Sequence, residues 1–223
     1  MVERKRFLDS MVALKNDLLE MAALAQQHLN EATKAAKQRD VELARQVIAK
    51  DELVNNYEIK IEEECIRLLA TQQPLASDLR MLTAILKINN DLERIADHAV
   101  NIAQSVEKIA DKPPVKPLIS IPRMTEIVQE MLRSSLDALV QEKLELARQV
   151  CQQDDEVDNL NDEVVRELIT YMMEDPRTIS RALELINISK NLERVADLAT
   201  NIAEDVVFIF QAKIIKHHVE EEL

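Results

Sequence analysis

The chain has 223 residues, no glycine and a formal net charge of −13, from 28 Lys and Arg against 41 Asp and Glu. Without glycine it holds neither the phosphate-binding loops nor the dinucleotide fingerprints that need backbone without a Cβ atom. The negative charge repels nucleic acid and anionic lipid, and favours cations or basic protein surfaces as partners. Aromatic residues make up only 2%, while Ala, Leu, Glu, Lys and Gln abound, which predicts an all-α protein.

The sequence shows no signal for a membrane or for secretion. The longest apolar run near the C-terminus is VVFIF at 206–210, far short of the roughly 18 residues that span a bilayer. The first residues lack the apolar segment of a secretory signal. Cys65 and Cys151 lie in helical patterns without metal-ligand spacing. They predict free thiols in a reducing compartment, the cytoplasm.

The first half of the chain predicts three long helices. Apolar residues recur with helical periodicity over 5–37. Asp40 is the expected N-cap of a second helix over 41–71. A third helix is predicted over 74–110, with Pro74 in its first turn, where a missing N–H costs nothing.

The second half repeats this plan after a proline-rich linker at 112–122. The sequence ELARQV occurs at 42–47 and again at 145–150. A helix is predicted over 123–141, and Pro176 precedes the last long helix as Pro74 precedes the third. The repetition predicts two similar three-helix units in one chain.

The strongest repeat is LERIADHAVNIA at 92–103, which returns as LERVADLATNIA at 192–203 with 9 of 12 positions identical. We therefore divide the chain into a first three-helix repeat (1–111), the linker (112–122) and a second repeat (123–223) that ends in a polar tail. The predicted fold is all-α, with six long helices in two similar three-helix bundles.

Each copy separates into an apolar face and an acidic face on a helix. The apolar positions step by four and three, which is the spacing of a packing seam. They are Ile88, Leu92, Ile95, Ala99, Ile102 and Val106, and their counterparts Ile188, Leu192, Val195, Ala199, Ile202 and Val206.

The acidic face carries oxygen-bearing side chains at i, i+4 and i+8. These are Glu93, Asp97 and Asn101 in the first half, and Glu193, Asp197 and Asn201 in the second. The second helix of each half adds a pair with the same spacing, Asp51 with Asn55 and Asp154 with Asp158. Carboxylates one turn apart repel each other and destabilise a helix, so their repetition suggests that a cation compensates them.

If the second and third helices pack side by side, four oxygen side chains converge in each half. Carboxylate and amide oxygens suit Mg²⁺, Mn²⁺, Ca²⁺ or iron, and zinc is less expected without Cys or His. The alternative is a solvated acidic face partly neutralised by Arg94 and Arg194. Both interpretations remain open on spacing alone.

The histidines do not indicate an enzyme. A di-iron centre requires Glu-x-x-His on two helices, and no Glu stands three residues before His28, His98, His217 or His218. His98 is either a partly buried residue at the flank of the seam or a phospho-accepting residue, and its counterpart Leu198 favours burial. No nucleophile elbow or triad spacing is present, so we predict a non-enzymatic protein.

With these motifs in view, the chain resembles the PhoU family of phosphate-uptake regulators. The most specific stretch is LATQQPLASDLRMLTAILKINNDLERIADHAVNIA at 69–103. The resemblance implies a cytoplasmic protein of two three-helix bundles that represses the phosphate response when phosphate is plentiful. It also implies contacts with the phosphate ABC transporter ATPase and a phosphate-sensing histidine kinase.

Some family members hold multinuclear iron or zinc clusters on acidic motifs of this spacing. Carried over, the ligands are Glu93 and Asp97 in the first half and Glu193 and Asp197 in the second, with the Asp51 and Asp154 pairs on the neighbouring helices. Asn55 stands where the second half has Asp158, so the first site is expected to carry one charge fewer.

The resemblance therefore favours a metal-binding adaptor between the phosphate transporter and its sensor kinase. We expect a homodimer, and the sequence itself leaves the oligomeric state open, because VVFIF and the long seams could serve a dimer or only the internal core. A carboxylate-bundle metal-storage or oxidase protein and a metal-free helical tether are the alternatives. The sequence leaves the metal, the partner surface and any direct binding of phosphate open.

Overall fold

The computed structural model describes residues 2–115 and 120–213. Its elements in these ranges are α1 (Val2–Gln38), α2 (Val41–Ala49), α3 (Asp51–Gln72), α4 (Ser77–Ile109), α5 (Ser120–Gln141), α6 (Leu144–Glu174), the short 3₁₀ helix η1 (Pro176–Thr178) and α7 (Ile179–Gln211). No strand occurs in this part of the chain. The predicted all-α fold is confirmed.

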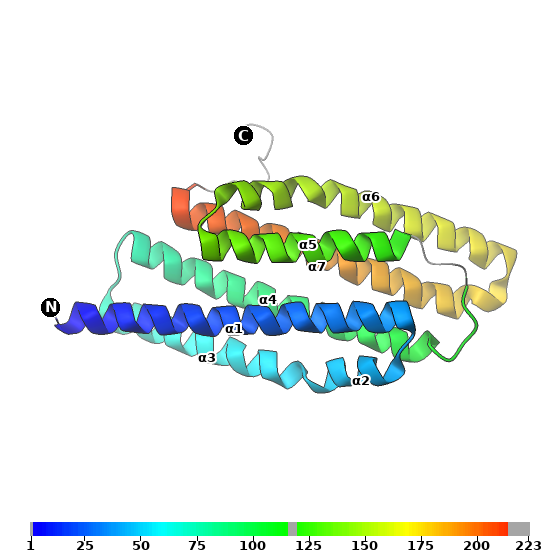
Figure 1. Ribbon diagram of the computed structural model, residues 1–223, viewed down its shortest axis with the longest axis horizontal. Coiled ribbons are helices and arrows are strands. Elements are labelled where there is room, and N and C mark those ends of the chain that lie inside the picture. The colour runs from blue at the N-terminus through cyan, green and yellow to red at the C-terminus, as the bar shows by residue number, and fades with distance from the viewer. Residues whose placement is uncertain (1, 116–119, 214–223) are drawn as a thin grey trace.

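The helices form two bundles that pack side by side along their lengths (Figure 1). In the first bundle α1, α2 and α3 pack on α4, and in the second α5 and α6 pack on α7. The third helices, α4 and α7, run antiparallel at the centre and contact each other, while α1 contacts α5. The two predicted three-helix units therefore share one long interface.

The predicted second helix is interrupted once, at Lys50. The φ and ψ angles of Lys50 are −90° and −4°, and its N–H donates to the carbonyls of Gln46 and Val47. Its ammonium group lies 3.0 Å from a carboxylate oxygen of Glu31 on α1. The interruption separates α2 from α3, whereas α6 runs unbroken through the equivalent region.

Helix ends use left-handed residues other than glycine, because the chain has none. Arg39 (φ 57°) follows α1, and Asp40 then caps α2 by accepting a hydrogen bond from the N–H of Leu43 at 3.0 Å, as predicted. Glu142 and Ala212 take the same conformation after α5 and α7. A left-handed residue with a Cβ atom costs roughly 1–2 kcal/mol, so neighbouring contacts must hold these turns.

Two helix starts differ from the prediction. Helix α4 begins at Ser77, so Pro74 lies in the preceding turn and not in the first turn of the helix. Helix α5 begins at Ser120 and not at 123, which places Pro122 in its first turn, where proline is tolerated. Pro176 occupies the first turn of η1. The polar tail with His217 and His218 lies outside the described residues.

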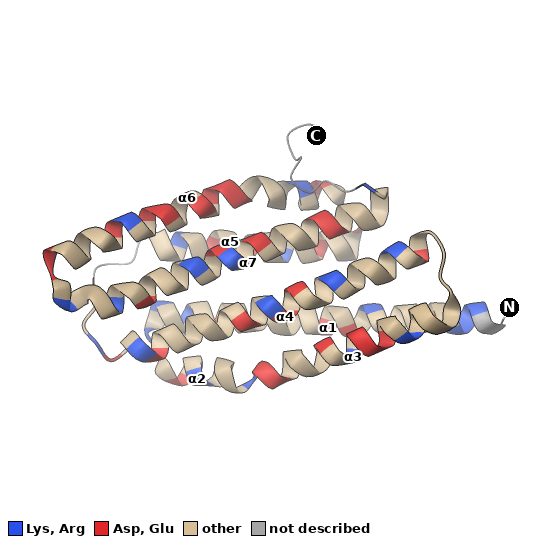
Figure 2. Ribbon diagram, turned by 180° about the vertical axis from the view of Figure 1, so that it is seen from behind, with Lys and Arg blue, Asp and Glu red and all other residues tan. Residues whose placement is uncertain are grey.

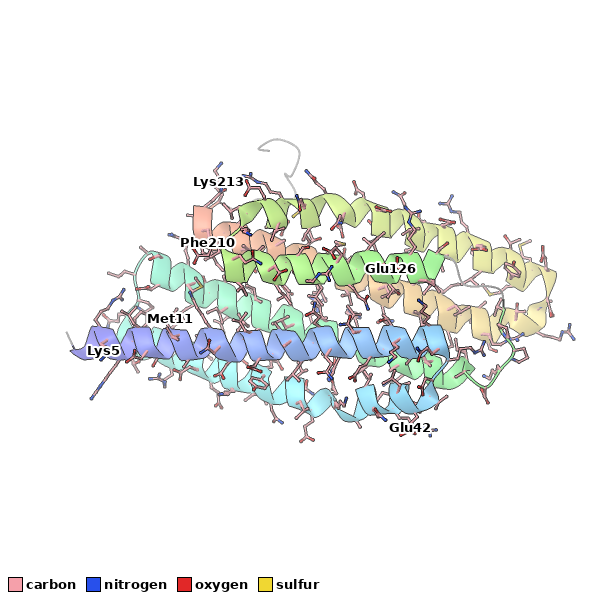
Figure 3. All side chains as sticks on the ribbon, in the orientation of Figure 1. Lys5, Met11, Glu42, Glu126, Phe210 and Lys213 are labelled. Atoms are coloured by element: carbon pink, nitrogen blue, oxygen red, sulfur yellow. The ribbon has the colours of Figure 1, made fainter. Side chains whose placement is uncertain are left out.

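The predicted seams form the centre of the core. Every seam residue of α4 and α7 is buried, and the buried side chains of both bundles form one continuous cluster. Side chains fill the space between the helices (Figure 3). A shared core of this kind couples the stability of the two repeats.

No helix in the described ranges is long and apolar enough to cross a membrane. Cys65 is buried and Cys151 is half-buried, and both are free thiols. Burial raises the pKa of Cys65 to about 12 and that of Cys151 to about 11. Both thiols therefore stay protonated and unreactive near neutral pH.

Candidate functional site

The fold brings the acidic residues of neighbouring helices together in both repeats. The first cluster lies between α3 and α4 and consists of Asp51, Asn55, Glu58, Glu93 and Asp97. The second cluster lies between α6 and α7 and consists of Asp154, Asp158, Glu193 and Asp197. Seen from behind, α6, α7, α4 and α3 lie in front and carry many acidic residues (Figure 2).

Carboxyl groups of the first cluster hold their protons more tightly than usual. Burial and the nearby carboxylates of Asp97, Glu58 and Asp51 raise the pKa of Glu93 to about 7. Burial and the carboxylates of Glu62 and Asp97 also raise the pKa of Glu58. The side-chain amide of Asn55 donates to Asp51 across 3.2 Å. Carboxylates on α3 and α4 therefore repel one another at close range.

The second cluster repeats this arrangement. Burial and the carboxylates of Asp197 and Asp158 raise the pKa of Asp154 to about 6. The pKa values of Asp158 and Glu193 are raised by burial and by Asp197. Four carboxylates thus converge between α6 and α7.

The arginines next to the two motifs act differently. Arg194 lies 3.5 Å from Glu193 and 3.1 Å from Asp197, so it partly neutralises the second cluster. Arg94 instead lies 4.0 Å from Asp91. The expected neutralisation by arginine is therefore observed at the second cluster, whereas the ion pair of Arg94 is with Asp91, outside the first cluster.

Oδ1 of Asp51 and Oδ1 of Asn55 are buried without a hydrogen-bond donor, and Oδ1 of Asp154 is buried with only the Thr200 hydroxyl near enough to act on that carboxylate. A buried acceptor without a donor is costly, and a cation would satisfy it. No three His, Cys, Asp or Glu side chains in the described ranges already stand as a ligand shell. Coordination therefore requires side chains to turn, or water to complete the shell, as is common for hard divalent ions.

The outer asparagines of the predicted rows differ in their surroundings. Asn101 is exposed, and Asn201 lines a small pocket of about 340 Å³ between α4 and α7 with Asp91 and Asp205. Four residues advance a helix by about 400°, so each i+4 step turns the side chain by about 40°. Two such steps carry the asparagine off the face that holds Glu93 or Glu193.

Sequence reasoning missed Glu58, the fourth carboxylate of the first cluster. Glu58 stands seven residues after Asp51 and so shares its helix face. Its counterpart in the second repeat is Asn161, which is why the repeat did not reveal it. Because Glu58 offsets the absence of a carboxylate at Asn55, each cluster holds four carboxylates.

His28 was also missed as a neighbour of the first cluster. Its side chain on α1 is 1% exposed, and neither ring nitrogen has a hydrogen-bond partner. Burial lowers the pKa of His28, opposed by the charges of Asp51 and Glu31. The buried neutral imidazole near Asp51 offers the first cluster a nitrogen atom as a metal ligand. The second cluster has no such nitrogen at this position, because Met131 stands where the first repeat has His28.

His98 is half-buried, as predicted, and joins the two bundles. Its Nδ1 atom on α4 lies 2.8 Å from Oδ1 of Asn191 on α7. This contact between α4 and α7 explains the position of His98 as a structural one, without a phosphate-accepting role.

The raised carboxyl pKa values predict an unusual pH dependence without metal. The native state binds protons at Glu93 between pH 8 and 5 that the unfolded state does not, so this residue stabilises the fold as the pH falls. Glu93→Gln should therefore stabilise the protein in EDTA by about 1 kcal/mol at pH 8, after solvent screening.

The difference between Glu93→Gln and wild type should vanish near pH 5, because Glu93 is then protonated in the native state. Urea unfolding at several pH values measures this difference in the free energy of unfolding. His28 contributes to the pH dependence with the opposite sign, but it is present in both proteins, so its contribution cancels in the comparison. A difference that stays constant from pH 8 to 5 would contradict the electrostatic account of the first cluster.

Two three-helix repeats, packed through their third helices and each bearing an acidic cluster, define the chain as a two-repeat helical bundle protein. The profile of the PhoU domain matches residues 18–106 and again 121–206. The chain belongs to the PhoU family, as the sequence motifs indicated.

Known PhoU proteins are similar to this chain over nearly its whole length. A protein of Aquifex aeolicus named as a PhoU homolog, a phosphate-specific transport system accessory protein, is 43% identical over 93% of this chain and 95% of its own length. The crystal structure of PhoU from Pseudomonas aeruginosa superimposes with a TM-score of 0.90 at 38% identity, covering 93% of this chain and 100% of that one. The crystal structure of the phosphate transport system regulatory protein PhoU from Streptococcus pneumoniae superimposes with a TM-score of 0.84 at 28% identity, covering 93% of this chain and 98% of that one.

Proposed function

We propose that this chain is a non-enzymatic, cytoplasmic regulator of phosphate uptake and of phosphate-starvation signalling. The names of its relatives, an accessory protein and a regulatory protein of phosphate transport, support this role. In our proposal it acts as a metal-binding adaptor between the ATPase of the phosphate ABC transporter and a phosphate-sensing histidine kinase.

The observation that carries the metal proposal is the pair of equivalent acidic clusters with unpartnered buried oxygens. Asp51, Glu93 and Asp97 would hold cations in the first cluster together with Glu58. In the second, the ligands would be Asp154, Asp158, Glu193 and Asp197. The oxygen donors suit a multinuclear cluster of iron, with zinc or another divalent ion as the alternative.

The mechanism that we propose is a change of surface charge. Each cluster concentrates four carboxylates between two long helices, and divalent cations would offset most of that charge. A basic partner surface fits the acidic state and a less basic one fits the metal-loaded state, because complementary potentials govern which partners associate. The helices act as rigid supports that present the clusters.

A homodimer fits the apolar side chains that the fold leaves exposed. Leu8, Val12 and Leu19 on α1 are 46%, 59% and 36% exposed, and Ile59 and Ile66 on α3 are each 55% exposed. Exposed apolar residues along neighbouring helices are typical of a protein interface. We propose that α1 and α3 contribute to the dimer contact.

The alternative functions predict different chemistry. A storage or oxidase bundle requires redox turnover with oxygen, and a metal-free tether requires no metal at all. Asp97 and Asp158 are exposed. Their exposure favours a surface that binds a partner, and argues against a buried catalytic centre.

Partner binding tests the adaptor proposal. We expect the affinity of wild type for the purified transporter ATPase or the kinase cytoplasmic domain to change about tenfold between Mn²⁺ and EDTA. The variant Glu93→Gln, Asp97→Asn, Glu193→Gln, Asp197→Asn should show no such change, since its clusters carry little charge. The matched control Asp9→Asn, Glu20→Gln alters exposed carboxylates of α1 and should respond like wild type. Equal binding by wild type with and without metal would contradict the mechanism.

A further inference from the structure

A second concave site lies at one end of the molecule, on segments far apart in the sequence. It is a cavity of about 690 Å³ between the last turns of α1 and α4, the first turns of α5 and α7, and residues 113–115. This volume is in the range of small-molecule sites, about 300–1,000 Å³. The acidic clusters contribute none of its lining residues.

The floor of the cavity is apolar and belongs to both repeats. Val106 and Ile109 come from α4, Ile121 comes from α5, and Leu185 and Ile188 come from α7. All five are aliphatic, so the floor suits an apolar body and offers it no hydrogen-bonding partner.

The rim of the cavity is cationic, although the whole chain carries a charge of −13. Its charged lining residues in the described ranges are Lys34, Lys37, Arg39 and Arg181, with Glu126 as the single acidic one. Cations gathered around an apolar floor in an acidic protein indicate an anionic ligand, because the local potential opposes that of the remaining surface.

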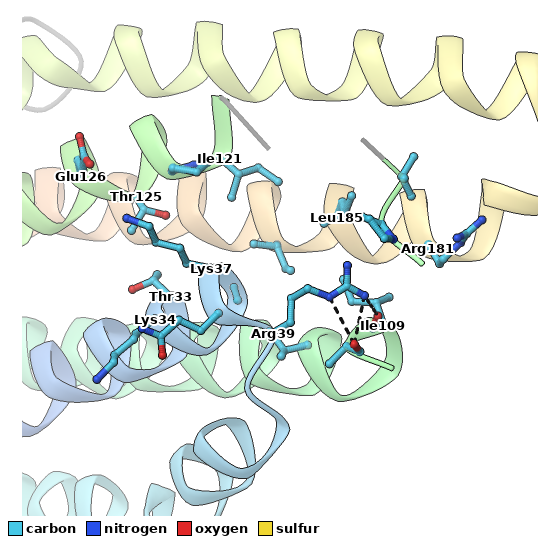
Figure 4. A pocket seen from close by; sticks show the side chains of 18 of the residues that line it. Thr33, Lys34, Lys37, Arg39, Ile109, Ile121, Thr125, Glu126, Arg181 and Leu185 are labelled. Atoms are coloured by element: carbon cyan, nitrogen blue, oxygen red, sulfur yellow. Dashed lines mark hydrogen bonds between the residues drawn. The ribbon is translucent and has the colours of Figure 1, made fainter. Parts of the chain in front are cut away.

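The two arginines build the walls. The guanidinium group of Arg39 donates to the carbonyls of Ile109, Ala110 and Lys112, at the end of α4 (Figure 4). Arg181 donates to the carbonyl of Pro113 at 2.6 Å. These bonds fix the end of α4 and the following residues against the cavity.

Lys37, an exposed residue in the last turn of α1, offers its ammonium group to a ligand in the cavity. From the last turn of α1 it extends toward Thr125 on α5, across the cavity (Figure 4). Neither Lys37 nor its neighbour Lys34, one turn earlier, has an ion-pair partner among the residues that the structure describes. Thr125 and Gln129 of α5 line the same side and add polar atoms.

We propose that this cavity binds a small amphipathic anion, with its apolar body on the α4–α7 floor and its anionic group at Lys37. The anionic group is a carboxylate, phosphate or sulfonate, which an ammonium group binds through charge-assisted hydrogen bonds. Because the lining comes from both repeats, the ligand contacts the two bundles at once. This site and its ligand are independent of metal at the acidic clusters.

The test uses the full chain and the fluorescent probe anilinonaphthalene sulfonate, which joins an apolar ring system to one anionic group. We expect saturable binding of one probe per folded chain. Lys37→Glu should weaken binding about tenfold, and Thr125→Trp, which fills the cavity, should abolish it. The matched control Lys15→Glu makes the same change at an exposed position of α1 and should bind like wild type.

A neutral analogue separates charge from apolar contact. N-phenylnaphthylamine has the same rings without the sulfonate, so Lys37→Glu should leave its affinity unchanged. Thermal unfolding of each variant verifies that it is folded. Non-saturable binding, or equal affinity of wild type, Lys37→Glu and Thr125→Trp for the sulfonate probe, would overturn the proposal.

Discussion

Mn²⁺ at a hundredfold excess over its dissociation constant is expected to raise the free energy of unfolding by about 2.7 kcal/mol for each occupied cluster. The physical reason is that the native chain gathers four carboxylates in each cluster, whereas the unfolded chain separates them. The stabilisation should shrink from pH 8 to 5, because protons compete for Glu93 and Asp154, whose pKa values are about 7 and about 6.

Paired variants assign this stabilisation to its sites. Glu93→Gln with Asp97→Asn should remove the contribution of the first cluster, and Glu193→Gln with Asp197→Asn that of the second. The control Asp9→Asn with Glu20→Gln should keep the full effect. Thermal or urea unfolding with Mn²⁺ and with EDTA gives the difference. An equal Mn²⁺ effect in all three double variants would show that metal binds elsewhere or without specificity.

Truncation of the central seam is expected to destabilise the whole molecule. Leu192→Ala removes a fully buried side chain from α7, and such a change costs about 2–5 kcal/mol. The core is continuous across both bundles, so the two repeats should unfold together, in one transition at lower urea concentration.

The matched control is Leu183→Ala, on the same helix but 50% exposed, which should cost less than about 0.5 kcal/mol. Leu92→Ala in α4, also fully buried, should reproduce the effect of Leu192→Ala. Separate transitions for the two repeats, observed by hydrogen exchange, would contradict a shared core.

The duplicated motif explains why so much of the fold could be predicted. Two copies with the same apolar spacing identify the buried face twice, and every seam position of both copies is buried. The N-cap at Asp40 could be predicted as well, because it depends on a local contact: the side chain of Asp40 accepts a hydrogen bond from the N–H of Leu43.

Features that depend on distant contacts could not be predicted. The interruption at Lys50 has no proline or glycine to mark it and coincides with an ion pair to Glu31 on another helix. Arg39 ends α1 in a left-handed conformation, and its guanidinium group binds carbonyls some 70 residues away. The cavity near Lys37 likewise exists only after four distant segments meet.

The candidate metal site was predicted in part. Spacing indicated which carboxylates share a helix face, and the structure brings those of α3 and α4, and of α6 and α7, within electrostatic reach. Repetition could not reveal Glu58 or His28, because neither has a like residue in the second repeat. Asn101 and Asn201, at the far end of each row, stay a prediction as ligands, since two steps of four residues turn a side chain by about 80° from the start of the row.

The central claim is that the two acidic clusters bind metal. Elemental analysis tests it directly, on protein purified without chelators or a histidine tag, beside the variant in which Glu93, Asp97, Glu193 and Asp197 are all amides. We expect more than one equivalent of iron or another divalent metal per chain in wild type, and its loss in the variant. Metal-free wild type, or a variant that retains the same metal content, would contradict the account.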